Sequence, residues 1–336
     1  MKKTVIDYLN FCLAGIFILL VILYGITLVK KKEFDKLSWS AKIISLEPNS
    51  SDEKSGMLKI LDAVFINTFN QSENRLEFDS PKLIVSKKGS DSAYFWTQDD
   101  LLPDSLSVKY YSVEEKKFYQ LNVRLPLDKM KTLLENKSLG ADLKVEIQPE
   151  GKVLMMVEQS KNKSFGSKLV ENFQAKEIPG ILKMLVYRKY AGNEYNEFPS
   201  LKEVSDYSDI LIQKYLWGVK IETEDAEEIS EISAYAFDGK SMRTDNETFE
   251  DAKRRNIPNR ILIDWGNTQK YGSSYSFDSQ EILDAFKELN MMKSSEPVFI
   301  TFKLFKNEHP KAEISKGGKT IPLKDDYPDL PTKYAQ

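Results

Sequence analysis

The chain has 336 residues, of which 41% are hydrophobic, 29% are charged and 11% are aromatic. This length and composition suit about two folded, strand-rich domains and exclude a disordered chain. The formal net charge is −3, and lysine is mixed with acidic residues throughout. A nucleic-acid-binding surface requires clustered basic residues, so nucleic acid is excluded as a partner.

The first predicted element is a membrane-spanning helix at residues 8–29, a stretch that is almost wholly apolar. Its length matches the roughly 20 residues that a helix needs to cross a hydrocarbon core of ~30 Å. The stretch is longer than the roughly 7–15 apolar residues of a signal peptide. It ends in the lysines at 30–32, where a signal peptide would have a cleavage site with small residues. We therefore predict that residues 1–32 form an uncleaved signal anchor that crosses the membrane once.

The side of the membrane that holds the remaining chain is not determined by these flanking residues. Lysines at 2–3 and 30–32 nearly balance, with a slight excess after the helix. Such an excess weakly favours a cytoplasmic C-terminal part, but large domains translocate largely regardless of flanking charge. Cys12 is the only cysteine and lies within the apolar stretch, so the remaining chain has no disulfides.

The chain after the apolar stretch contains the same pattern twice. The segments around Trp39 and Trp217 match, as do residues 103–110 with 258–265, and 125–135 with 277–287. The order of the matches is kept, while the offset falls from 178 to 155 and then to 152 residues. Two copies of one fold with loops of different length produce this pattern. We predict modules at 33–178 and 215–323, an ordered connector at 179–214 that contains a helix, and a proline-containing tail at 324–336.

Alternating apolar residues predict the strands of the first copy. Residues 106–110 and 119–125 form a hairpin that turns at 112–116, and 143–147 and 153–157 form a second hairpin. Pro126 opens a helix between the two hairpins, because proline lacks an N–H and the N–H groups in the first turn of a helix have no partner within the helix.

The same reasoning extends through the connector and the second copy. Residues 169–178 resemble one strand, and Ser200 caps a helix that runs to 216. Asp278 and Glu281 have the spacing of a capping box, in which Glu281 reaches back to the helix start. The predicted fold class is α+β: an N-terminal transmembrane helix followed by two tandem modules, each a mostly antiparallel sheet with one packed helix.

The first copy carries a pattern that extends beyond secondary structure. Residues 106–119 form a strand that ends in an aromatic pair and continues as S-x-x-E-x-K-F-Y, and residues 125–130 read L-P-x-x-x-M. Residues 149–153 supply a P-x-G-x-V hairpin, and Trp39 supplies an early tryptophan. Together these features resemble the DUF2931 family of uncharacterised bacterial envelope proteins over residues 37–178. The second copy lacks the S-x-x-E pattern and the helix-opening proline, so we treat it as diverged.

The resemblance implies a place and a role for the protein. Members of the family are mostly expected to be lipoproteins, which implies a periplasmic soluble part. Here residues 8–29 would hold it at the bacterial inner membrane, and a cytoplasmic orientation is the alternative. Some members are thought to act as immunity proteins beside secreted antibacterial toxins. The resemblance transfers no catalytic residues.

The residues themselves provide little that could support catalysis. His309 is the only histidine and precedes Pro310 in a predicted turn, so a nucleophile would need partners that the sequence does not indicate. One histidine and one cysteine exclude the usual zinc sites, and phosphate- and dinucleotide-binding motifs are missing. We predict a protein that is not an enzyme and has no cofactor or metal. Acid pairs such as Asp99–Asp100 leave a carboxylate-based hydrolase as an alternative.

Two groups of residues are candidates for binding a partner. On the first hairpin, Tyr111 and Phe118 alternate with the inward-facing tyrosines 110 and 119, and exposed aromatic residues are favoured interface anchors. Packing in the core is their more ordinary role. The second group is acidic: two acids lie in the turn beside these aromatic residues, and a denser acidic cluster follows Trp217. Such charges would make a basic partner associate faster. A solvated loop is the simpler interpretation. The acids are Glu114, Glu115, Glu224, Asp225, Glu227 and Glu228.

These features predict a membrane-anchored binding protein of the bacterial envelope with a protein partner. Its most concrete form is an immunity-type protein that neutralises a secreted antibacterial toxin. Two alternatives stay open at this point: a carboxylate-based hydrolase of envelope glycans, and a structural component of an envelope complex.

Overall fold

The structure is a computed structural model, and it describes residues 5–33, 36–45, 56–75, 82–84, 93–96, 100–134, 139–159, 166–186, 201–237, 241–244, 251–326 and 328–334. Asp99 of the predicted acid pair and the predicted cap Ser200 lie outside these residues. The described elements confirm the predicted α+β class: strands that are mostly antiparallel, few helices, and an apolar helix near the N-terminus.

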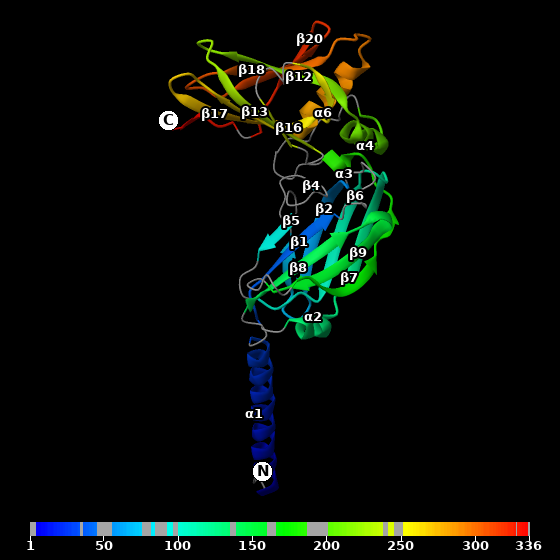
Figure 1. The fold of residues 1–336 in the computed structure, drawn as a ribbon. Helices are drawn as coiled ribbons and strands as arrows, with labels where there is room; N and C mark the ends of the chain where they lie inside the picture. Colours follow the sequence, from blue (N-terminus) through cyan, green and yellow to red (C-terminus); the bar gives the residue numbers. More distant parts are fainter. Residues whose placement is uncertain are drawn as a thin grey trace.

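The N-terminal helix α1 (Val5–Glu33) projects from one end of the molecule (Figure 1). Its segment Asn10–Leu28 is long and apolar enough to span a membrane and buries nothing against the rest of the protein. Apolar side chains such as Phe11 and Phe17 are exposed around it. Outside a core, a helix that is apolar on all sides suits a lipid environment better than water.

In the described part of the first module, eleven strands divide between two sheets. The described helices there are α2 (Leu127–Leu133) and the short 3-10 helix η2 (Pro149–Gly151). The strands in chain order are β1 (Trp39–Ser45), β2 (Leu58–Asn67), β3 (Ser72–Arg75), β4 (Lys82–Ile84), β5 (Ala93–Trp96), β6 (Ser105–Ser112), β7 (Lys117–Arg124), β8 (Ala141–Ile147), β9 (Lys152–Glu158), β10 (Lys168–Gln174) and β11 (Lys176–Ile178).

The connector contains α3 (Lys183–Val186) and α4 (Val204–Ile212). The second module has one helix among its described residues, α6 (Ser279–Met291). Its strands are β12 (Tyr215–Thr223), β13 (Ile229–Ala236), β14 (Ser241–Thr244), β15 (Lys253–Arg255), β16 (Pro258–Trp265), β17 (Lys270–Ser276), β18 (Val298–Leu304), β19 (Lys311–Lys316), β20 (Lys319–Leu323) and β21 (Thr332–Tyr334).

The two modules have the same sheet topology. In the first, one sheet has the order β10-β9-β8-β1-β5 and the other β11-β7-β6-β2-β3, with β4 also paired to β2. In the second, the orders are β20-β19-β18-β12-β15 and β21-β17-β16-β13-β14, so each strand of one path has a counterpart in the other. Each module has one parallel pair, β1 with β8 or β12 with β18, and the other described pairings are antiparallel.

Irregular features also recur at matching places. Strand β2 shifts register between Ile60 and Asp62, where Ile60 faces Tyr110 of β6. Strand β13 shifts between Ile229 and Glu231, where Ile229 faces Trp265 of β16. A β-bulge re-aims a strand and is a specific feature of a fold, so a shared bulge supports the interpretation of the modules as two copies.

A buried tryptophan joins the two sheets in each module. The indole N–H of Trp39 on β1 donates to the carbonyl of Leu101 at 3.2 Å, just before β6 in the other sheet. The indole of Trp217 on β12 donates in the same way to the carbonyl of Asn256 at 3.1 Å, just before β16. Both carbonyls lie two residues before the proline that was matched in the sequence, Pro103 or Pro258.

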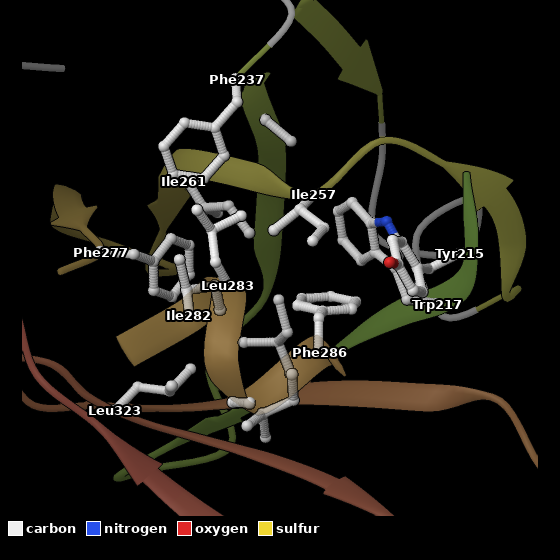
Figure 2. Packing of buried hydrophobic residues seen from close by; sticks show 14 of the residues in the cluster. Tyr215, Trp217, Phe237, Ile257, Ile261, Phe277, Ile282, Leu283, Phe286 and Leu323 are labelled. Atoms are coloured by element: carbon white, nitrogen blue, oxygen red, sulfur yellow. The ribbon is translucent and has the colours of Figure 1, made fainter. Parts of the chain in front are cut away.

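The core of each module lies between its sheets, and the module's helix packs against it. In the second module Phe286 of α6 contacts both Trp217 and Tyr215, with ring centroids 6.4 and 5.4 Å apart, respectively (Figure 2). Ile282 and Leu283 on the same helix point into the same cluster. The apolar residues of this helix therefore lie on the face that it buries.

Several local predictions are corrected by the structure. The stretch 169–178 is two strands, because the chain passes from one sheet to the other at Ala175. Asp278 caps α6 as predicted, but the Glu281 carboxylate accepts the N–H of Lys324 at 2.7 Å. Helix α4 of the connector is capped by Glu203 and ends at Ile212, before the predicted end at 216, because β12 begins at Tyr215. Residues 324–334 are not a separate tail, since β21 pairs with β17.

We predict that Trp39→Phe and Trp217→Phe each lower the free energy of unfolding by about 1–3 kcal/mol. Either substitution keeps most of the ring but leaves a buried carbonyl, of Leu101 or Asn256, without its donor. The measurement is urea unfolding of the full chain in detergent, followed by far-UV circular dichroism. The half-exposed Tyr235→Phe is the control and should change stability by less than about 0.5 kcal/mol. Tryptophan variants as stable as the control would contradict the proposed tie between the sheets.

Candidate functional site

The predicted aromatic pair lies where the two modules meet. Tyr111 and Phe118 face each other across β6 and β7, with ring centroids 4.7 Å apart. Their exposed fractions are 0% and 4%. A Cβ added at Gly180 of the connector would overlap the Phe118 ring. Both aromatic residues are therefore covered by the protein's own connector, and the hypothesis that they bind an external partner is corrected.

Helix α4 is the element that covers this hairpin. The hydroxyls of Tyr111 and Ser208 are 2.6 Å apart, and the rings of Tyr111 and Tyr207 meet edge to face at 6.4 Å. Lys116 in the turn of the hairpin forms a salt bridge of 2.6 Å with Asp209. One face of α4 thus packs on the end of the first module.

Helix α4 also contacts the second module. Asp206 of α4 forms a 3.2 Å salt bridge with Lys287 of α6. Its other carboxylate oxygen accepts the backbone N–H groups of Lys202 and Glu203, at 2.8 and 3.0 Å. The N–H of Lys202 is the first cause that holds the pKa of Asp206 below its usual value. The modules therefore stack head to tail through α4, as seen between the two bodies in Figure 1.

This junction depends on a difference in hairpin length between the copies. Tyr110 and Tyr119 stack at 5.3 Å in the first module, and Trp265 and Tyr271 stack at 4.8 Å in the second. Eight residues separate the first pair and five separate the second. This difference of three residues explains why the offset between the two copies falls from 155 to 152 residues after this hairpin. The three extra residues lengthen the first hairpin, and this longer end is the part that packs on α4.

The acids of the first hairpin serve its backbone. The Glu114 carboxylate accepts the N–H of Met57 at 2.8 Å, and the Glu115 carboxylate accepts the N–H of Glu150 at 2.7 Å. Glu150 lies in the turn between β8 and β9 with a positive φ of 60°, and its hydrogen bond links this turn to the neighbouring hairpin. The two carboxylates therefore hold three loops of the first module together at the junction end.

The second acidic group forms the turn between β12 and β13. Lys306 lies beside it, with its ammonium 2.7 Å from Asp225 and 3.1 Å from Glu227. The hydrogen bond to Asp225, followed by that to Glu227, raises the pKa of Lys306. The N–H of Glu228 donates to the side chain of Asn267, whereas Glu224 is exposed. The negative charge of this acidic turn is therefore balanced in part by Lys306 of the same module.

A hollow of about 560 Å³ opens on the second module, at β18, β19 and the segment after β20. Lys303 and Lys311 lie directly opposite each other on the antiparallel strands β18 and β19. Pro322 and Pro328 contribute apolar walls, and charged side chains of both signs surround the opening. The lining residues are Tyr275, Thr301, Lys303, Pro310, Lys311, Ala312, Glu313, Pro322, Leu323, Lys324, Asp325 and Pro328.

The first module does not repeat this arrangement. By the matching registers of β8 and β18, Glu146 stands where the second module has Lys303, and its partner Leu154 stands in place of Lys311. Like charges directly opposite on antiparallel strands are destabilising. Because the first copy folds without the lysine pair, the fold does not require it. The hollow is therefore a candidate binding site on the second module.

Sequence reasoning missed this hollow for a clear reason. Lysine occurs throughout the chain, so Lys303, Lys311 and Lys324 do not stand out in the sequence. Only the registers of three neighbouring strands, together with the residues that directly follow β20, bring them together. His309 is exposed in the turn before β19. Among the described residues, no three of His, Cys, Asp and Glu form a group that could hold a metal ion.

Comparisons with known proteins find no match among family models, curated proteins or solved structures. The resemblance of residues 37–178 to the DUF2931 family therefore stays a prediction. The site has to be interpreted from the geometry of this chain alone.

We predict that Phe118→Ala lowers the free energy of unfolding by about 3–5 kcal/mol, because it empties a fully packed position between the modules. Tyr111→Phe removes only the hydroxyl that contacts Ser208 and should cost about 0.5–1.5 kcal/mol. Lys116→Ala breaks an exposed ion pair and should cost less than about 1 kcal/mol. The same unfolding measurement ranks the three variants, and an equal loss for all of them would contradict the packing described for this junction.

We predict that Asp206→Ala lowers the free energy of unfolding at pH 7 by about 1–2 kcal/mol, since it removes a cap and an ion pair from α4. The folded-state pKa of Asp206 lies below its ordinary value of 3.8. Its stabilisation is therefore complete above that value and is lost as the pH falls through the folded-state pKa. Unfolding curves of both proteins, measured from pH 7 to pH 2, should converge in acid. A constant difference across this range would contradict the assignment.

Proposed function

We propose that this chain is a membrane-anchored binding protein that presents its second module to a protein partner. The observation that supports this proposal is that α1 lies at one end of the molecule and the second module, whose residues line the hollow, lies at the other (Figure 1). An anchor at one end and a recognition site at the other would hold the site away from the lipid surface.

The junction supports this proposal because it stiffens the arm between the anchor and the site. Burial of Tyr111 and Phe118, the hydroxyl contact to Ser208 and the ion pairs of α4 fix the first module against the second. A large apolar interface limits motion between domains. A partner bound at the hollow would then be held in a defined orientation to the membrane.

The lining of the hollow suggests the chemistry of the partner. Three lysines and two acids surround walls formed by proline, alanine and leucine. Such a lining suits a protein segment that carries both apolar and acidic side chains, with the lysine charges raising the rate of encounter. In its most specific form the proposal is an immunity-type protein at the bacterial inner membrane, with its soluble part in the periplasm, whose partner is a secreted antibacterial toxin.

A carboxylate-based hydrolase is the second candidate, and one observation favours it. Glu313 and Asp325 both line the hollow, and a pair of carboxylates is the usual machinery of glycoside hydrolysis. Asp325 also accepts the N–H of Ser276 at 3.0 Å, which gives it a structural role at the end of β17. The third interpretation, a structural component of an envelope complex, would use the same surfaces in a constitutive assembly.

We predict that the tagged full chain, solubilised in detergent from cells that express the neighbouring genes, captures a stoichiometric protein partner. A double substitution, Lys303→Glu with Lys311→Glu, should weaken this capture at least tenfold by reversing the charge of the hollow. The readout is mass spectrometry of the captured protein, followed by a binding titration with the purified partner.

Lys152→Glu is the matched control, because it reverses an exposed lysine on β9 of the first module and should leave binding unchanged. Equal binding by the control and the double variant would remove the hollow from the interface. No captured protein, together with release of reducing sugars from envelope glycan that Glu313→Gln abolishes, would favour the hydrolase instead.

A further inference from the structure

Strand β21 closes one edge of the second module with few contacts. It pairs with β17 over three positions, with Lys270 opposite Tyr334 and Gly272 opposite Thr332. All three of its residues are exposed. The side-chain amide of Gln269 donates to the carbonyl of Tyr334 at 2.6 Å. A short, exposed edge strand belongs to the low-stability part of a fold.

A side-chain contact sets the position of this strand. The ring of Tyr334 lies over Gly272, and a Cβ at position 272 would overlap the ring. Tyr334 itself is 48% exposed, so the glycine forms an open seat beneath an aromatic ring. Glycine within a strand often marks such a close approach. The edge of β17 therefore combines backbone groups for pairing with one position that admits an aromatic side chain.

In the first module, the strand that corresponds to β21 is β11, and it is held more firmly. Strand β11 pairs with β7 in the matching register, with Ile178 opposite Phe118. Only Ala175 separates it from β10, and the N–H of Ala175 donates to the carbonyl of Gly151 at 2.8 Å. Beyond β11 the chain enters the connector, whose helix α4 packs between the modules. Strand β11 is therefore held at both ends.

The connection to β21 is longer and is fixed at its near end. Residues 324–331 separate β20 from β21. The N–H of Asp326 donates to the carbonyl of Ser276 at 2.8 Å, and the Asp325 carboxylate accepts the N–H of Ser276. These bonds hold the connection to the end of β17 independently of β21. Movement confined to residues 328–334 would uncover the edge of β17, and it would also move Pro328 from the wall of the hollow.

We infer that β21 is an exchangeable strand, and that its place on β17 accepts an extended segment of the protein partner with an aromatic residue over Gly272. This inference rests on the proposed binding function and names the surface that the partner uses. An added strand gains affinity from main-chain hydrogen bonds and specificity from the side-chain seats along the edge. Here the seat over Gly272 selects the aromatic residue, and the displaced segment opens the hollow beside it.

A peptide of the chain's own residues 328–336, labelled with fluorescein, tests the site directly. The chain ending at residue 327 should bind this peptide, and a peptide with Tyr334→Ala should bind at least tenfold more weakly. Gly272→Val in the shortened chain should abolish binding, because its side chain fills the seat. Ser274→Val, two residues further along β17, is the matched control and should retain it. Equal affinity of the two peptides would overturn the aromatic seat.

Hydrogen exchange of the intact chain provides a test that does not depend on the shortened chain folding. Amides of residues 332–334 should exchange at least tenfold faster than those of β16, the strand on the other side of β17. Protection of 332–334 equal to that of β16 would overturn the inference.

Competition separates this inference from the proposed function. The 328–336 peptide should displace a captured partner from the full chain. A partner that is captured but not displaced, with β21 protected, would leave the binding function standing and overturn strand exchange. Peptide binding to the shortened chain without any captured partner would overturn the proposed function. A dimer of the full chain that the peptide dissociates would assign the edge to a second copy and overturn the choice of partner.

Discussion

The buried indole N–H of one tryptophan in each module is the interaction on which the architecture depends. Trp39 and Trp217 lie on the strands that form the parallel pairs, and each is almost fully buried. A buried N–H without an acceptor is costly, so each indole donates to a carbonyl that lies just before a strand, Leu101 before β6 or Asn256 before β16. Because that strand belongs to the other sheet, one hydrogen bond sets the relation between the two sheets.

The two modules share the same core and sheet topology, and they differ in their hairpin turns. The first hairpin is longer by three residues, and the additional length is used to hold α4. The second copy ends its hairpin at Gly266, which has a φ of 108°, followed by exposed polar residues. In a stack of repeats the outermost unit needs such a polar end, since no neighbour covers it. The array therefore has a joining end on the first module and a polar end on the second.

The differences on the sheets follow the same logic. The first module places Glu146 and Leu154 where the second has Lys303 and Lys311, and it holds β11 by short connections where the second holds β21 by a longer one. A feature that one copy omits without loss of the fold is not required for folding. The hollow and the edge strand meet at Pro328. The proposed binding surface thus gathers on the module that lies farther from α1.

The sequence by itself determined the apolar helix, the duplication and most strands, because these depend on local periodicity and on matches along the chain. It also placed the hairpin turns and the cap at Asp278. Tertiary structure alone decided that Tyr111 and Phe118 are covered, that Glu114 and Glu115 bind backbone N–H groups, and that three lysines share a hollow. A residue's neighbours across a sheet or a junction depend on register and on how modules stack. These long-range pairings leave no periodic signal in the chain, so residue type alone could not distinguish a partner surface from the joint between the modules.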